Sequence, residues 1–190
     1  MNLFFDKKWN NIAVSVSGGA DSALLLYLLC KEVTSQTVHI INNVRCWKTK
    51  PWQEHDAEYV ITWIRKRFPA INFKLHKNFI APDIEYGEIG PSIKDEYGKI
   101  VSGDNIQIRS YAEYVCFKNN VDAYYNGVTK NPNENLGGMI ERDIEPTEEN
   151  KHLLIMEHME RYAIHPFRFT SKDKLIEKYK PTPRGYYGGA

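Results

Sequence analysis

The sequence predicts an α/β fold in which helices cover a parallel sheet. Short apolar stretches alternate with stretches of helical periodicity between residues 11 and 75, in the order strand, helix, strand, helix, strand. Parallel strands need long crossover connections, which are usually helices, so this alternation favours a parallel sheet. The length of 190 residues suits one domain with a core of its own.

Residue patterning places the individual elements along the chain. The expected strands are residues 11–17, 37–41, 71–75 and 121–125, and the expected helices are residues 23–32, 51–68, 104–119, 151–161 and 171–179. The stretch between residues 76 and 103 holds several Pro and Gly, and we expect an irregular functional loop or lid there. Residues 1–179 are expected to form the domain, and residues 180–190 an irregular tail.

The strands are expected where apolar and β-branched residues gather. Ile12, Val14 and Val16 dominate the first strand, and the second reads Thr-Val-His-Ile-Ile. The third alternates apolar and polar residues, as a half-buried strand does. The fourth ends at Tyr125 and leads directly into the polar sequence Asn-Gly-Val-Thr.

The helices are expected from residue spacing and from end signals. The first is rich in leucine, which suits a helix packed on a sheet. Pro51 suits the first position of the second helix, and Pro69 ends it. Ile108 and Val115 share one face of the third, and Ser171 is a suitable N-cap for the last.

Composition excludes several classes of protein. A formal net charge of +1 gives no electrostatic case for a general nucleic-acid binder. No apolar run is long enough to span a bilayer and the first residues lack a signal-peptide core, so we expect a cytoplasmic protein without a membrane partner. The three cysteines, Cys30, Cys46 and Cys116, form no CxxC pair; we expect free, buried thiols and no zinc site.

The loop of residues 17–22, Ser-Gly-Gly-Ala-Asp-Ser, is the strongest functional signal. It joins a buried strand to a helix, where free amide groups and the helix dipole favour an anion. Glycine allows a phosphate to approach the backbone closely. Asp21 would repel a bare phosphate, so it indicates either a Mg²⁺ ligand or a helix cap. The alternative is an ordinary tight turn; neither a Walker A motif nor GxGxxG is present.

In its context after an apolar strand, this loop resembles the SGGxDS loop of the ATP pyrophosphatases of the adenine nucleotide alpha-hydrolase group. The resemblance implies a Rossmann-like parallel sheet with helices on both faces, and cleavage of ATP between its α and β phosphates. It implies an adenylated substrate that a nitrogen or sulfur nucleophile then attacks. The residues implied to bind ATP are Ser15, Ser17, Gly18, Gly19, Ala20, Asp21 and Ser22, with Asp21 and Ser22 also acting in catalysis.

Two further segments resemble the same group. Asn42, Asn43 and Val44 close the second strand, where members of the group meet the adenine or ribose. The sequence Asn-Gly-Val-Thr-Lys-Asn at residues 126–131 looks like their Gly-Thr/Ala-x-Asn segment, which implies that Gly127 and Thr129 bind the nucleotide. Glu134 follows and is a candidate Mg²⁺ ligand; the alternative there is a solvated, Asn-rich turn.

Two cationic side chains are candidates for catalysis. His-Pro-Phe at residues 165–167 followed by Ser-Lys resembles a late segment of these enzymes whose lysine approaches the phosphates, which implies that role for Lys172. Arg109 resembles an arginine in the helix before the fourth strand and would neutralise a phosphate or a substrate carboxylate. The alternatives are an exposed lysine and a surface salt bridge.

Within the group, the chain is most similar to 7-cyano-7-deazaguanine synthases. That resemblance implies adenylation of 7-carboxy-7-deazaguanine, attack by ammonia and dehydration to a nitrile with further ATP. The four zinc-binding cysteines usual near the end of that family are missing, so the carboxylate substrate remains open. Other readings are a tRNA-modifying ligase similar to lysidine synthetases and a nucleotide-binding module without turnover. A homodimer is compatible with either.

Overall fold

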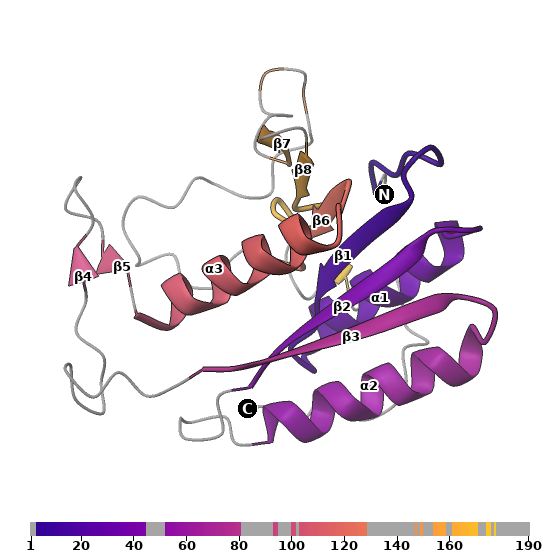
Figure 1. The fold of residues 1–190 in the computed structure, drawn as a ribbon, viewed down its shortest axis with the longest axis horizontal. Coiled ribbons are helices and arrows are strands. Elements are labelled where there is room, and N and C mark those ends of the chain that lie inside the picture. Colours follow the sequence, from indigo (N-terminus) through magenta and orange to yellow (C-terminus); the bar gives the residue numbers. More distant parts are fainter. Residues whose placement is uncertain are drawn as a thin grey trace.

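The computed structural model describes residues 3–44, 52–80, 93–94, 100–101, 103–128, 147, 149, 154–158, 161–170, 174–175 and 177. Within them, one six-stranded sheet has the strand order β3-β2-β1-β6-β8-β7 (Figure 1). Its strands are β1 Asn11–Ser15, β2 Thr37–Val44, β3 Asn72–Phe79, β6 Ala123–Tyr125, β7 Ile155–His158 and β8 Arg161–Ile164. All neighbours are parallel except β7, which pairs antiparallel with β8.

In the described part of the chain, helices α1, α2 and α3 cover the two faces of this sheet (Figure 1). They are α1 Ala20–Glu32, α2 Gln53–Arg67 and α3 Gly103–Lys118. Successive strand residues point to opposite faces, so Ile12 and Val14 pack with α1 and α2, whereas Ala13 packs with α3. The predicted class is confirmed: a parallel, Rossmann-like sheet with helices on both faces.

Most element bounds lie close to the predicted ones, with extensions. The second and third strands run on to Val44 and Phe79, so the first residues of the expected irregular stretch are strand. Further on, β4 Ile93–Lys94 and β5 Ile100–Val101 form a short antiparallel pair. The first helix begins at Ala20, three residues earlier than its apolar run indicated.

The predicted helix over residues 151–161 is wrong. Residues 155–158 and 161–164 form the hairpin of β7 and β8 instead. Its inner strand pairs with β6, with Tyr125 opposite Ile164, and both side chains are fully buried in the main core. Long-range pairing and burial therefore override the local helix preference of this segment. In the last predicted helix, Lys174, Leu175 and Glu177 are helical, and Ser171 lies outside the described residues.

The cysteines that can be placed match the expectation. Cys30 and Cys116 are free and buried, and burial raises the pKa of Cys30 to about 12 and that of Cys116 to about 11. Both are therefore packing residues at neutral pH. Cys46 lies outside the described residues. None of the helices in the described part of the chain is long and apolar enough to cross a membrane.

Two histidines meet on the α3 face of the sheet. His39 Nδ1 lies 3.0 Å from His76 Nε2, and His39 Nε2 lies 3.3 Å from Asn11 Oδ1. If His39 Nε2 donates to Asn11 Oδ1, its Nδ1 must accept from His76 Nε2, so the His39 ring is neutral in this arrangement. Burial, His76 and Lys74 lower the pKa of His39 to about 4; burial, Lys74 and Lys118 lower the pKa of His76.

This pair predicts loss of stability in acid. The unfolded state takes up protons below the ordinary histidine pKa of about 6.5, whereas folded His39 resists them until about pH 4. The stabilisation is thus complete above pH 6.5 and decreases as the pH falls toward 4. Denaturant unfolding should give a free energy about 2 kcal/mol lower at pH 5 than at pH 7.5. His39→Gln should reduce this difference; an unchanged difference would show that other groups cause it.

Candidate functional site

The order of the strands marks one place where a ligand would bind. From β1, the chain crosses through α1 on one face to β2, whereas α3 leads to β6 from the other face, and β1 lies between β2 and β6. Open parallel sheets bind ligands at such a switch point, outside the carboxyl ends of the strands. The loops after β1 and β6, which hold Ser17 and Gly127, flank this point.

The loop after β1 has a fixed backbone shape. Gly18 has a φ of +81°, a conformation that glycine adopts without strain. Ser22, in the first turn of α1, holds the loop: its hydroxyl donates to the Gly19 carbonyl at 3.0 Å and accepts from the Ser17 amide at 3.2 Å. The two serine hydroxyl oxygens lie 3.3 Å apart. The loop is therefore folded before any ligand binds.

The start of α1 presents backbone donors beside this loop. Gly19 is the N-cap, and the first helical hydrogen bond joins the Ala23 amide to the Gly19 carbonyl at 3.0 Å. The amides of the first helical turn, from Ala20 to Ser22, precede that bond and have no acceptor within the helix. Together with the helix dipole they can hold an anion.

Asp21 lies in the first turn of α1 and is not the cap residue. The helix-capping alternative for this aspartate is therefore wrong, because Gly19 occupies the cap position. The carboxylate is half-buried, and a negative charge in the first turn of a helix interacts favourably with the dipole. Its predicted role as a metal ligand stays a prediction.

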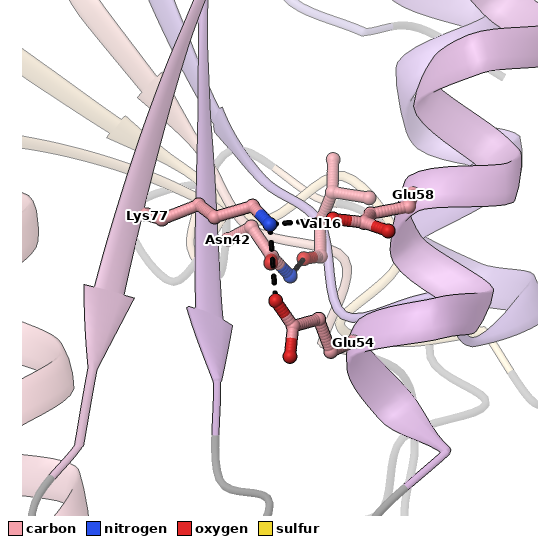
Figure 2. A network of polar contacts seen from close by, with 5 residues as sticks. All are labelled: Val16, Asn42, Glu54, Glu58 and Lys77. Atoms are coloured by element: carbon pink, nitrogen blue, oxygen red, sulfur yellow. Dashed lines mark hydrogen bonds and ion pairs between the residues drawn. The ribbon is translucent and has the colours of Figure 1, made fainter.

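The second helix forms one wall of the loop. A Cβ atom on Gly18 would lie 2.7 Å from both the Ala57 amide nitrogen and Asp56 Cβ, so α2 packs directly against the Gly18 backbone. Lys77 of β3 holds this end of α2 through ion pairs with Glu54, at 3.0 Å, and Glu58 (Figure 2). These hydrogen bonds raise the pKa of Lys77.

Gly127 forms the opposite wall. A Cβ atom there would lie 3.2 Å from the Ser22 amide nitrogen and 3.3 Å from the carbonyl group of Asp21. The structure thus brings together the two segments that the sequence singled out, residues 17–22 and the loop after β6. The chain reaches Gly127 from β6, whose neighbour β8 fixes the Asn126 amide through the Ile164 carbonyl at 3.0 Å.

Ser15 and the end of β2 lie at the same edge of the sheet. Ser15 Oγ is 2.7 Å from the hydroxyl of Tyr124, whose pKa burial raises. Asn42 is fully buried and donates to the Val16 carbonyl at 2.9 Å (Figure 2). Asn43 accepts from Asn78 at 2.8 Å. Val44 is buried, so any contact of these residues with a nucleotide falls mainly to the backbone and to half-buried Asn43.

The remaining candidates are less constrained. Arg109 is exposed on α3, and none of the hydrogen bonds between described residues joins it to the loop of residues 17–22. Thr129, Glu134 and Lys172 lie outside the described residues, so their roles remain predictions. In the described segments, no group of three or more His, Cys, Asp or Glu side chains could hold a metal ion.

Sequence reasoning missed the contribution of α2. Nothing in the local pattern of residues 53–67 connects them with the loop, because the contact with Gly18 depends on tertiary packing. The signal in the sequence was the glycine itself, since glycine is the residue that allows a close approach of two backbones. In the sequence, Glu54 and Glu58, one helical turn apart, indicate only a solvent-exposed helix face. The structure shows that both carboxylates form ion pairs with Lys77.

The two glycine contacts predict a graded effect of alanine. Gly18→Ala should lower the free energy of unfolding by about 2–4 kcal/mol, because its Cβ clashes with α2 and its positive φ disfavours alanine. Gly127→Ala should cost about 1 kcal/mol, since its contacts are less close. Gly19→Ala, with φ −73° and 3.5 Å to the nearest atom, is the control. Chemical denaturation measures all three, and equal stabilities would contradict this packing.

Two solved structures are similar to this chain at low sequence identity. A U34-tRNA thiolase NcsA from Methanococcus maripaludis is 16% identical with a TM-score of 0.53 over 93% of this chain, and the chain spans 61% of that protein. A phosphoadenylyl-sulfate reductase from Candida auris is 12% identical with a TM-score of 0.47, over 95% of this chain and 75% of that one. No family model and no curated protein matches the chain. The thiolase, at this identity, shows the fold that the chain adopts.

Proposed function

We propose that this chain is an ATP pyrophosphatase that binds ATP on the loop of residues 17–22 and forms AMP and pyrophosphate. The observation that carries the proposal is the preformed loop at the switch point, closed by backbone contacts at Gly18 and Gly127. Glycine at both positions leaves the loop amides within reach of a polyphosphate. The fold shared with a thiolase of 16% identity is compatible with this proposal and does not by itself carry it.

The proposed reaction has two steps. A substrate carboxylate oxygen attacks the α phosphorus of ATP, the bond to the β-phosphate oxygen breaks, and pyrophosphate leaves. Ammonia then attacks the acyl carbon; the bond to the AMP oxygen breaks, AMP leaves and a proton is released to give the amide. Negative charge grows on pyrophosphate in the first step, and the amides between Ala20 and Ser22 are fixed where they can stabilise it.

The proposed metal is a magnesium ion shared with the phosphates. Mg²⁺ commonly binds one or two carboxylates together with substrate phosphates and water, and Asp21 lies beside the anion-binding amides. When bound, the ion neutralises charge on the phosphates. Glu134 is the proposed second ligand, and Lys172 the proposed cation on the phosphates. Ser22 positions the loop through the bonds described above.

The proposed acceptor is a small carboxylate, with 7-carboxy-7-deazaguanine as the first compound to test and ammonia as the nitrogen source. Arg109 is the proposed partner of a substrate anion. The second candidate acceptor is tRNA, which the solved thiolase of the same fold acts on by its name. A module that binds ATP without turnover is the third.

Replacing Asp21 tests the reaction at its metal ligand. With ATP, Mg²⁺, ammonia and the acceptor, the native protein should release AMP and pyrophosphate in equal amounts. Asp21→Asn should reduce this rate at least about 100-fold while circular dichroism and melting temperature stay close to native, since the residue contacts the phosphates through the metal. Release of ADP and phosphate by the native protein would refute the proposed cleavage site.

The acceptor can be identified by what stimulates AMP formation. We expect 7-carboxy-7-deazaguanine to raise the rate of AMP release in the presence of ammonia, and unmodified tRNA to leave it unchanged. Stimulation by tRNA alone would select the second candidate. If ATP raises the melting temperature and no acceptor yields AMP, the chain is a binding module.

A further inference from the structure

Asn42 lies where the backbone pairing between β1 and β2 ends. The last residues in register are Ser15 and Ile41, and the Val16 amide then donates to the Ile41 carbonyl at 2.8 Å. The Asn42 side chain continues the pairing by one step, because its Nδ2 donates to the Val16 carbonyl at 2.9 Å (Figure 2). Val16 is therefore held to β2 by both of its backbone polar groups, immediately before the loop begins at Ser17.

The surroundings of Asn42 make this contact specific to an amide. Both Asn42 and Val16 are buried, with exposed fractions of 0% and 1% for the whole residues. A buried carbonyl group without a donor is costly, and an apolar side chain supplies none. An aspartate of the same shape would bring an acceptor toward the Val16 carbonyl and a negative charge toward the phosphate loop. Among the described residues, the Asn42 amide oxygen has no hydrogen-bond partner. The side chain therefore acts here as a donor, through the bond from its Nδ2 to the Val16 carbonyl.

Lys77, the neighbour of Asn42 in the sheet, acts on the same loop indirectly, through α2. Asn42 pairs with Lys77 across β2 and β3, and both side chains project toward α2 (Figure 2). Lys77 holds α2 through Glu54 and Glu58, and α2 packs against Gly18. Two adjacent side chains thus act on the start of the loop: Asn42 directly at Val16, and Lys77 through α2 at Gly18.

We propose that Asn42 is a positioning residue, which sets the entry geometry of the phosphate loop through Val16 and so raises affinity for a nucleotide polyphosphate. This role belongs to the buried side chain, whereas the adenine or ribose contact expected from the sequence falls mainly to backbone atoms. The affinity part rests on the proposed ATP function, whereas the loop-ordering part does not.

The test compares two buried side-chain amides, one within β2 and one immediately before it. Asn42→Leu removes the donor to Val16. Gln36→Leu is the matched control: Gln36 is 2% exposed, immediately precedes β2, and bonds to Lys7, Thr34 and Ser35 away from the loop. Both substitutions should lower the melting temperature. Amide hydrogen exchange at Val16 and Ser17, measured without ligand, and the ATP dissociation constant, measured by calorimetry with Mg²⁺, then separate positioning from stability.

Asn42→Leu should speed exchange at both amides and weaken ATP binding by about tenfold, as expected for loss of one buried hydrogen bond. Gln36→Leu should leave both quantities at native values. Native exchange at Val16 and Ser17 in Asn42→Leu, or an equal change in the control, overturns the proposal. If the native protein does not bind ATP, the proposed function fails, while the exchange data still decide whether Asn42 orders the loop.

If Asn42→Leu does not fold, Asn42→Asp replaces it. A protonated carboxyl group can donate to the Val16 carbonyl and an ionised one cannot, and burial raises the pKa of such a group. Exchange at Ser17 relative to the native protein should therefore be closer to native at pH 5.5 than at pH 8. A difference from native that is equal at the two pH values would refute the role of the donor.

Discussion

The close approach of Gly18 to the second helix is the constraint on which the site depends. A side chain there would meet the backbone of α2 at 2.7 Å, so the loop can lie against this helix only as glycine. On the opposite side, Gly127 leaves room for the backbone of Asp21 and Ser22 in the same way. The loop after β1 is thus held between two backbone surfaces, and its amides keep a fixed direction.

The strand pairing and the packing of α2 hold the two glycines in these positions. The parallel ladder of β1 with β2 and β6 places the two loops at one edge, and the burial of Ile12, Val14 and Tyr125 keeps the strands in register. Lys77 then fixes α2, since its ammonium group joins two carboxylates one helical turn apart. Exposed ion pairs contribute little alone, and here they add to the buried contacts of Ala57, Val60, Ile61 and Ile64 that pack α2 into the core.

Sequence patterning was sufficient to predict those helices and strands whose residue spacing or flanking residues indicate them locally. Hydrophobic period and glycine placement gave β1, α1, β2, α2, β3, α3 and β6, each within a few residues of its observed bounds. The hairpin at residues 155–164 was predicted as a helix because its strand character comes from pairing with β6, which no local pattern encodes. The motif was enough to predict that Gly127 belongs to the site, but its close approach to Ser22 depends on tertiary packing. The same holds for the hydrogen bond from buried Asn42 to Val16.

The central claim is that a nucleotide triphosphate lies on the amides at the start of α1, between Gly18 and Gly127. A crystal structure with α,β-methylene-ATP and Mg²⁺ tests it most directly, because that analogue resists cleavage at the α phosphate. The β and γ phosphates should accept hydrogen bonds from the amides of the loop, with Asp21 next to the metal. A triphosphate bound away from residues 17–22 would contradict this account.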